Sequence, residues 1–238
     1  MVIDVIRAFS VAGYAFAGGA KGIWLVRTIE EAVALREREP SALLMGEVDG
    51  RLIPGFDLNN SPARIATADI GGRQLIQRTG AGTQGAVGAA WAKYTLLCAL
   101  TNAQATTKYA RSLATVSGEP ITLLATGLLA GDDRYEEDDI CTDYVAALLQ
   151  DRYDEAQDIL ARGIEHLEAI GRFAGWQQGS SDFPFEDIAA VLSVNRFDFA
   201  IVGTFKEWQG ITYVDAQRVG LDDPSNESSH AFVGSPPP

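Results

Sequence analysis

The sequence predicts an α/β fold, a layered α/β/α domain with a mixed, largely parallel sheet. Short apolar segments alternate with amphipathic ones along residues 1–150, a pattern typical of strands alternating with helices. The chain has 238 residues, of which 47% are hydrophobic, so it can bury the core of one sizeable domain. We assign residues 1–221 to this domain and residues 222–238, which are rich in Pro and Ser, to a flexible tail.

Apolar runs predict the strands in chain order. They are expected at residues 1–6, 23–26, 42–45, 73–78, 94–100, 121–125, 199–202 and 211–214. Helical spacing and capping residues predict the helices that connect them. These are expected at residues 11–20, from 28 to before 40, from 61 or 62, from 85 to about 91, up to about 114, at 140–149, at 156–170 and at 185–194.

The charge balance excludes two classes of partner. The chain has 19 Lys and Arg against 32 Asp and Glu, a formal net charge of −13, and no run of basic residues. Nucleic acid and anionic membrane surfaces are therefore not expected to bind. No apolar segment approaches the ~20 residues that cross a bilayer, and the N-terminus does not resemble a secretory signal, so we expect a cytoplasmic protein.

The cysteines and histidines argue against zinc chemistry. Cys98 and Cys141 both lie among apolar residues, which predicts buried thiols and not a disulfide or a metal pair. His166 lies on a predicted helix and His230 in the predicted tail, so their spacing does not indicate a shared metal site with the cysteines.

The loop at residues 45–62 is the first candidate for a site. It follows a buried strand and combines turn formers with carboxylates and amides, and a loop of this length inside a compact domain is often functional. Glu47 stands where the strand would end. The other polar groups crowd the point where Pro62 can open a helix: Asp57, Asn59, Asn60 and Ser61. An ordinary capped loop is the alternative interpretation.

Polar groups also follow the other predicted strands. Asp4 is the one charge inside the first apolar strand, and if it is buried it needs a cation, either Arg7 or a metal ion. The strand that ends at Arg78 runs into the glycine loop 79–85 and then a helix, an arrangement that can hold an anion. Thr101 and Asn102 end a further strand.

Two kinds of strand-end group therefore stand out. The carboxylates are Asp4, Glu47, Asp57, Glu137, Asp138 and Asp139; the anion ligands are Arg7, Arg78, Thr79, Thr83 and the glycine amides. Carboxylates that leave water positions open suit Mg²⁺, and arginines with loop amides suit phosphoryl oxygens. Together they indicate metal-assisted phosphoryl chemistry on a small anion. An acidic cluster at a helix N-terminus is the simpler interpretation of residues 132–139.

Two other classes of protein are weighed against this one. Gly80, Gly82 and Gly85 satisfy G-x-G-x-x-G, which would suit an NAD(P)-binding oxidoreductase, but the next strand ends without the acid that a ribose requires. No Gly-Lys-Ser/Thr follows these glycines, which excludes a P-loop. A non-catalytic anion-binding module would keep the anion pocket without a metal.

Several motifs, in order, resemble those of the 2-phosphosulfolactate phosphatase family, which contributes to coenzyme M biosynthesis and contains Mg²⁺-dependent acid phosphatases. They are Val2-Ile3-Asp4-Val5-Ile6-Arg7-Ala8, Gly46-Glu47, Pro54-Gly55-Phe56-Asp57-Leu58-Asn59-Asn60-Ser61-Pro62, the loop 79–83, Asn102-Ala103 and Glu137-Asp138. The resemblance implies removal of phosphate from 2-phosphosulfolactate to give sulfolactate. It covers roughly residues 1–150, and it makes a homodimer plausible.

On this basis we expect specific roles for the site residues. Asp4, Glu47 and one of Glu137 or Asp138 are expected to hold Mg²⁺, and Asp4, Arg7, Glu47 and Asp57 to form the catalytic group. The phosphate and acid groups of the substrate are expected to contact Asn60, Ser61, Arg78, Thr79, Gly82, Thr83 and Asn102. A water on the metal is the expected nucleophile, with Ser61 as a covalent alternative.

The chain departs from the family pattern in three places. The usual Thr-Thr-Asn-Gly-Thr loop is replaced by a glycine loop with Ala81 where an Asn amide is expected, and a Cys-Ala-Gly turn is replaced by Ala125-Thr126-Gly127. These two changes bear on the choice of substrate. Relatives also tend to carry a further segment before the first strand, so a truncated start is an expectation here.

Overall fold

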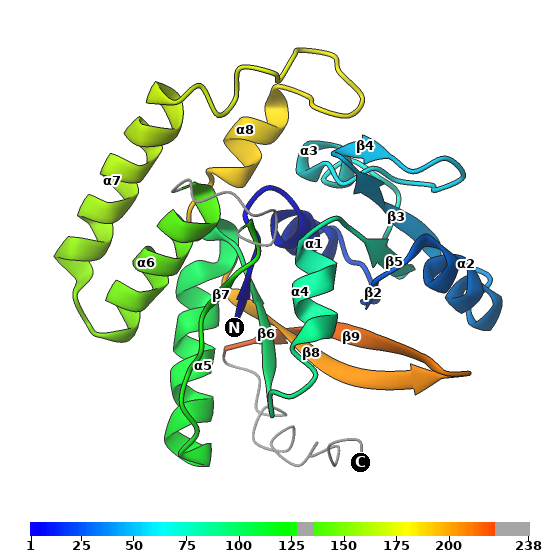
Figure 1. The fold of residues 1–238 in the computed structure, drawn as a ribbon, viewed down its shortest axis with the longest axis horizontal. Coiled ribbons are helices and arrows are strands. Elements are labelled where there is room, and N and C mark those ends of the chain that lie inside the picture. The colour runs from blue at the N-terminus through cyan, green and yellow to red at the C-terminus, as the bar shows by residue number, and fades with distance from the viewer. Residues whose placement is uncertain (128–135, 222–238) are drawn as a thin grey trace.

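A computed structural model describes residues 1–127 and 136–221 (Figure 1). The strands are β1 (Val2–Ile3), β2 (Gly22–Val26), β3 (Leu43–Val48), β4 (Arg51–Leu52), β5 (Gln74–Arg78), β6 (Thr95–Cys98), β7 (Leu124–Ala125), β8 (Phe199–Trp208) and β9 (Ile211–Gly220). The helices are α1 (Ala8–Ala17), α2 (Ile29–Arg38), α3 (Pro62–Ile65), α4 (Gly82–Gly88), α5 (Ala103–Ser117), α6 (Glu137–Leu149), α7 (Tyr153–Ala169) and α8 (Glu186–Val191). Part of the acidic segment and the whole predicted tail, residues 222–238, lie outside the described residues.

The strands form one mixed sheet in the order β4-β3-β5-β2-β9-β8-β6-β1-β7, which confirms the α/β class and the mixed sheet. Strands β3, β5 and β2 are parallel to one another, as are β6, β1 and β7. The antiparallel hairpin β8–β9 lies between these two groups. Strands β8 and β9 end at residues 208 and 220, well beyond their predicted ends. The strands are parallel within each of the two groups, as expected, but the hairpin pairs antiparallel with both groups.

The two parallel groups run in opposite directions, because three antiparallel pairings separate β2 from β6. In a flat sheet, the carboxyl ends of β1 and β5 would therefore lie at opposite rims. Twist accumulates at about 20–25° per strand, or roughly 100–125° over the five steps from β5 to β1. Figure 1 shows this twist, because β6 runs steeply across the direction of the β8–β9 hairpin.

Helix α4 joins the two strand ends by packing closely against β1. A Cβ added at Gly82 would lie 2.5 Å from Asp4 Oδ2, and one added at Gly85 would lie 2.6 Å from Thr126 Cγ2 and 3.1 Å from Val2 Cγ1. Both glycines are thus required for this close approach. The G-x-G-x-x-G pattern is explained by packing of the helix on the strand, and the dinucleotide site is not favoured.

The structure confirms several features that were predicted from short stretches of sequence. Thr28 and Glu31 form the predicted capping box of α2, and Ser61 caps α3 with Pro62 as its first residue. Cys98 and Cys141 are fully buried free thiols, as predicted. None of the helices in the described ranges has both the length and the apolar character needed to cross a bilayer.

Candidate functional site

A cavity of about 200 Å³ opens where the ends of β1, β3 and β5 meet the loop that follows α7. Most of the charged or polar side chains at these three strand ends contribute to it. Its lining consists of Asp4, Ile6, Arg7, Glu47, Asp49, Gly50, Asn60, Thr79, Ala81, Arg172, Trp176 and Phe183. The expected convergence of Asp4 and Glu47 on one cavity is therefore observed.

Asp4 is the most strongly perturbed carboxyl of this lining. It is 4% exposed, and its Oδ1 accepts a hydrogen bond of 2.9 Å from the N–H of Ala8 at the start of α1. Burial is the main cause that raises the pKa of Asp4 to about 6. The charges of Glu137 and Glu47 act in the same direction, while the hydrogen bonds from Ala8 N and Thr126 act against it.

Asp138 lies directly behind Asp4. The hydroxyl oxygen of Thr126 is 3.3 Å from Oδ2 of Asp4 and 3.3 Å from Oδ2 of Asp138. Asp138 also accepts hydrogen bonds from the N–H groups of Val5 and Gly127, at 2.7 and 3.0 Å. Burial, and then the charge of Asp4, raise the pKa of Asp138 well above its usual range. Two crowded buried carboxyls favour a nearby cation.

Glu47 is held by two loops. Its Oε1 accepts from the N–H of Gly80 at 2.6 Å, and its Oε2 accepts from the N–H of Gly50 at 2.7 Å. These bonds tie the carboxylate at the end of β3 to the glycine loop after β5. Glu47 is therefore held in a fixed position in the cavity lining and is not a free surface side chain.

Arg7 is buried in the wall of the cavity. Its Nη1 donates to Asp187 Oδ2 at 2.9 Å and to Asp182 O at 2.6 Å, and its Nη2 donates to Gly50 O at 2.9 Å. Its guanidinium carbon also lies 5.5 Å from the Trp176 ring centroid and 5.2 Å from that of Phe183. Asp187 is fully buried and offsets the charge of Arg7.

Arg172 is a second cation of the lining and pairs with Glu137. Its Nε and Nη2 donate to the two carboxylate oxygens of Glu137 at 2.8 and 2.6 Å, and Glu136 lies 3.3 Å from Nε. Glu137 was expected as a metal ligand, but it does not line the cavity and both of its oxygens are engaged by Arg172. Of the two acids considered at this position, Asp138 is the one adjacent to Asp4.

Asn60 and Thr79 line the cavity as expected for substrate-binding residues. Asn60 Oδ1 accepts a hydrogen bond of 3.2 Å from Gln77 Nε2, which orients its amide. Thr79 Oγ1 accepts from the N–H of Thr83 at 3.1 Å, and Thr83 Oγ1 in turn accepts from the N–H of Thr79 at 2.9 Å. Thr83 is fully buried in the first turn of α4 and does not line the cavity. The structure therefore does not show the contact with substrate that was expected for this residue.

Five other predicted residues, Ser61, Asp57, Arg78, Gly82 and Asn102, lie outside the lining. Asp57 is exposed and pairs with Arg36, and its Oδ2 accepts from Leu44 N. Arg78 donates to the carbonyl oxygens of Glu47 and Arg27. The remaining two side chains serve the backbone or a buried partner: Asn102 bonds Ala99 N and Leu97 O, and Ser61 donates to Asp187 Oδ1 at 2.8 Å. Gly82 contributes by admitting Asp4, as described above.

Replacing Ser61 by Ala should leave turnover within about threefold and lower the free energy of unfolding by about 1–2 kcal/mol. The side chain is fully buried, caps α3 and donates to Asp187, so its removal costs stability first. Urea unfolding and steady-state kinetics measure the two effects. A variant that folds with unchanged stability yet loses all turnover would restore Ser61 as a nucleophile.

The donor set suits a divalent cation at Asp4 and Glu47. No group of three or more His, Cys, Asp or Glu side chains that could hold a metal is found within residues 1–127 and 136–221. Mg²⁺, however, usually takes one or two protein carboxylates and completes its shell with water and substrate phosphate. Two buried carboxylates on one small cavity, with the raised pKa of Asp4, meet that requirement.

Several site residues were not predicted from the sequence. Arg172, Trp176 and Phe183 lie in a Gly- and Ser-containing loop after α7, where only their unusual size and charge could have attracted notice. Asp187 resembles an ordinary acid of a helix first turn, next to Glu186. Its full burial is visible only once the chain is folded.

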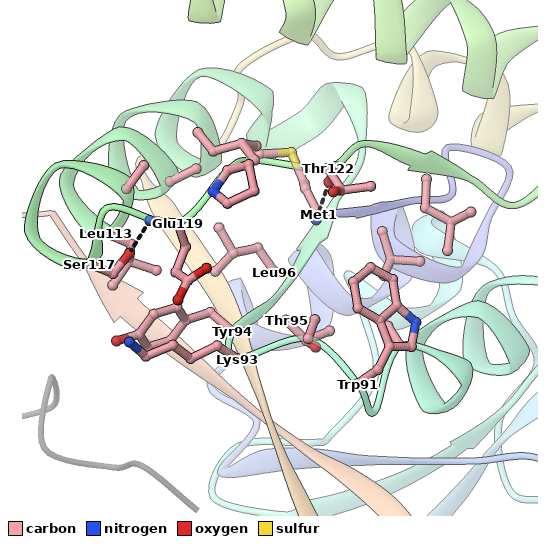
Figure 2. Close-up of a pocket in the computed structure, with 18 residues that line it drawn as sticks. Met1, Trp91, Lys93, Tyr94, Thr95, Leu96, Leu113, Ser117, Glu119 and Thr122 are labelled. Carbon is pink, nitrogen blue, oxygen red and sulfur yellow. Dashed lines mark hydrogen bonds between the residues drawn. The ribbon is translucent and has the colours of Figure 1, made fainter. Parts of the chain in front are cut away.

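A larger cavity, about 370 Å³, lies elsewhere, between α5 and the start of β1 (Figure 2). Apolar side chains such as Trp91, Leu96 and Leu113 dominate its lining. Glu119 is its one carboxylate and Lys93 its one cationic side chain, and the described lining includes no arginine. Although this cavity is the larger of the two, its lining lacks the paired acids and the arginines that suit phosphoryl chemistry.

Comparison with known proteins gives a consistent result. A family model described as 2-phosphosulpholactate phosphatase matches residues 1–169. Relatives named "Probable 2-phosphosulfolactate phosphatase" are found in Bacillus subtilis, with 41% identity over 63% of each chain, and in Deinococcus radiodurans, with 37% identity over 73% of this chain and 67% of that protein. A third, in Thermus thermophilus, is 38% identical over 53% of this chain and 52% of its own.

The alignments span about half to two thirds of the length of these relatives. The matched residues include Asp4, Glu47 and Thr79, whereas Arg172, Trp176 and Phe183 lie just beyond the family match. The acids and the glycine loop of the cavity thus fall in the part that the family shares. Because the family model matches residues 1–169, the chain belongs to the 2-phosphosulpholactate phosphatase family.

Proposed function

We propose that this protein hydrolyses the phosphate monoester of a small hydroxy acid, and that its substrate is 2-phosphosulfolactate, which yields sulfolactate and phosphate. One observation carries the proposal: Asp4 and Glu47, both buried, line the same small cavity as Arg7 and Arg172. Acids that can hold a divalent cation, beside cationic side chains that offset the negative charge of an anionic substrate, are a combination that phosphoryl transfer uses. The names of the relatives support the choice of substrate.

The size of the cavity supports a small substrate. Pockets for drug-sized ligands measure about 300–1,000 Å³, and this one measures about 200 Å³. A phosphorylated three-carbon acid is small enough for it. A dinucleotide is much larger than the cavity, which agrees with the packing role of Gly82 and Gly85.

Asp4 and Glu47 are the residues we assign to a Mg²⁺ ion, with Asp138 supporting Asp4 through Thr126. When bound, Mg²⁺ supplies polarisation of the phosphate and a coordinated water of lowered pKa. The chain contributes the fixed carboxylate of Glu47, held by Gly80 and Gly50, and the amide of Asn60, oriented by Gln77. Trp176 and Phe183 line the cavity, and their rings lie next to the guanidinium of Arg7.

The burial of Ser61 and its bond to Asp187 support direct attack by water over a covalent serine intermediate. Participation in coenzyme M biosynthesis follows from the same substrate. A cytoplasmic location is part of the proposal, supported by the two buried free thiols Cys98 and Cys141, which suit a reducing compartment. A homodimer also stays a prediction, which light scattering on the purified protein would test.

The experiment is a phosphate-release assay on purified protein, with 2-phosphosulfolactate, phospholactate and glycerol 2-phosphate as substrates. Release is expected with Mg²⁺ and should fall to background when EDTA removes it, then return when Mg²⁺ is added in excess. The panel also addresses the altered glycine loop with Ala81. If none of these phosphate esters is hydrolysed with Mg²⁺ present, the proposed function is wrong, and a non-catalytic anion-binding module becomes the better account.

A further inference from the structure

The two arginines of the cavity differ in how much of their hydrogen-bonding capacity remains. An arginine has five N–H donors. Arg7 donates to Asp187 Oδ2, Asp182 O and Gly50 O, and its side chain is 3% exposed. Arg7 therefore has its charge paired and most of its donors engaged within the wall. It is suited to shaping the cavity more than to binding a further anion.

Arg172 is oriented differently. Its pairing with Glu137 uses Nε–H and one N–H of Nη2, the side-on fork geometry of an arginine and a carboxylate. Within the described residues, no acceptor is bonded to Nη1. The side chain is 28% exposed and lines the cavity, and the bonds to Glu137 leave its Nη1 donors unused. The two hydrogen bonds to Glu137 thus fix the orientation of the Arg172 guanidinium.

Arg172 keeps its positive charge in these surroundings. Burial lowers the pKa of Arg172, but the hydrogen bond to Glu137 and the charges of Glu137, Glu136 and Asp138 together raise it by more, so the guanidinium stays charged. The phosphate is placed near Asp4 and Glu47 by the proposed function, which leaves Arg172 for another part of the substrate. The residue also lies beyond the family match at 1–169, in the segment that closes the cavity.

We propose that Arg172 binds the second acidic group of the substrate, the carboxylate or sulfonate next to the phosphorylated carbon, and so selects phosphorylated acids over neutral phosphate esters. This inference rests on the proposed phosphatase function and specifies its substrate class. Arg172 is a specificity-determining residue in this account, and Glu137 is its positioning residue.

The test compares kinetics of the wild type and Arg172→Gln on three substrates. These are 2-phosphosulfolactate, phospholactate, which has only a carboxylate, and glycerol 2-phosphate, which has no second acid. Loss of a charge-assisted contact should raise KM for 2-phosphosulfolactate about 10- to 100-fold and leave kcat within about threefold. The kcat/KM for glycerol 2-phosphate should change less than about threefold. The response of phospholactate tells which acid is bound: a matching rise in KM indicates the carboxylate, and no rise indicates the sulfonate.

Two further variants separate recognition from folding. Arg172→Gln leaves Glu137 without its partner, so the double variant Glu137→Gln/Arg172→Gln removes both charges and should show the same selectivity change. Arg162→Gln, an exposed arginine on α7, is the matched control and should behave as the wild type. A uniform loss on all three substrates, or unchanged KM in the folded double variant, would overturn the role of Arg172.

Binding of sulfolactate, measured by calorimetry, gives a readout that does not depend on turnover. The Kd should rise about 10- to 100-fold in Arg172→Gln and in the double variant, with no change in Arg162→Gln. If the wild type hydrolyses no substrate but sulfolactate binding still depends on Arg172, the phosphatase proposal fails and the acid-binding role stands. If binding is equal in all variants, the acid-binding role fails.

Discussion

The Asp4→Asn variant is expected to lose at least ~1,000-fold in turnover while it remains folded. The substitution preserves the shape of the side chain and an oxygen that can accept from Ala8 N. It removes the negative charge that the proposed site needs beside Glu47, within a cavity where charge is poorly screened. Phosphate release at saturating Mg²⁺ measures the effect.

Asp57→Asn is the matched control, because it makes the same change of acid to amide at a predicted catalytic residue that lies outside the cavity. Its turnover should stay within about threefold of the wild type. Full activity in Asp4→Asn would remove Asp4 from the mechanism. Equal losses in both variants would indicate that the charge effect is not local to the cavity.

Asp4→Asn should also be more stable than the wild type at neutral pH when divalent metal is removed. The pKa of Asp4 is raised to about 6 in the folded state from an ordinary value of 3.8, so the folded protein holds this proton more tightly than the unfolded chain does. Stability is therefore lost as pH rises from about 4 to about 6. At pH 7 the ionised Asp4 costs about 3 kcal/mol, which Asn does not.

Urea unfolding in EDTA at pH 4 and pH 7 measures this difference. The two proteins should be close in free energy of unfolding at pH 4, and Asp4→Asn should exceed the wild type at pH 7. A wild type that gains stability relative to the variant between these pH values would mean that the carboxylate is stabilised by the fold, contrary to the burial and repulsion that we describe.

Replacing Asp187 by Ala should lower the free energy of unfolding by about 3–5 kcal/mol and abolish turnover. This carboxylate is fully buried and accepts from Arg7 Nη1, Ser61 Oγ and Ala63 N, so it joins β1's end, α3 and α8. Its removal leaves Arg7 buried without its counter-charge. Thermal unfolding and kinetics on the same preparation measure the two losses.

Glu186→Ala is the control for position, because it removes an exposed acid from the same first turn of α8 and should change stability by less than about 0.5 kcal/mol. Asp187→Asn should be intermediate, since it can still accept from Ser61 and Ala63 but does not neutralise Arg7. A loss below about 1 kcal/mol in Asp187→Ala would show that the buried ion pair does not organise this wall.

Most of the residues that were expected at the cavity and line it stand at or just after the end of a strand, and Asn60, which precedes α3, is the exception. Asp4, Glu47 and Thr79 each follow an apolar run, and a strand end is a local signal. The mixed sheet was predicted, but the expectation that these residues meet at a single rim did not foresee the two oppositely directed parallel groups. The hairpin β8–β9 reverses half of the sheet, and its insertion between β2 and β6 has no local sequence signal.

The predicted residues that lie outside the cavity share a different cause. Ser61, Thr83 and Asn102 have short polar side chains, which readily satisfy nearby backbone groups, so their residue type alone does not distinguish a ligand-binding role from a local cap. Arg78 and Asp57 were placed near the site by sequence order, whereas the direction of a side chain depends on register. Arg172 contacts Glu137 across 35 residues, a pairing that only the folded chain shows.

The central claim is that Asp4 and Glu47 together hold a divalent cation beside a bound phosphate. A crystal structure with Mn²⁺ and phosphate tests it most directly, because the anomalous signal of Mn²⁺ locates the metal without ambiguity. One anomalous peak is expected in contact with the carboxylates of Asp4 and Glu47, with phosphate in the same cavity. Phosphate in the cavity without a metal peak, or a metal bound away from both carboxylates, would contradict it.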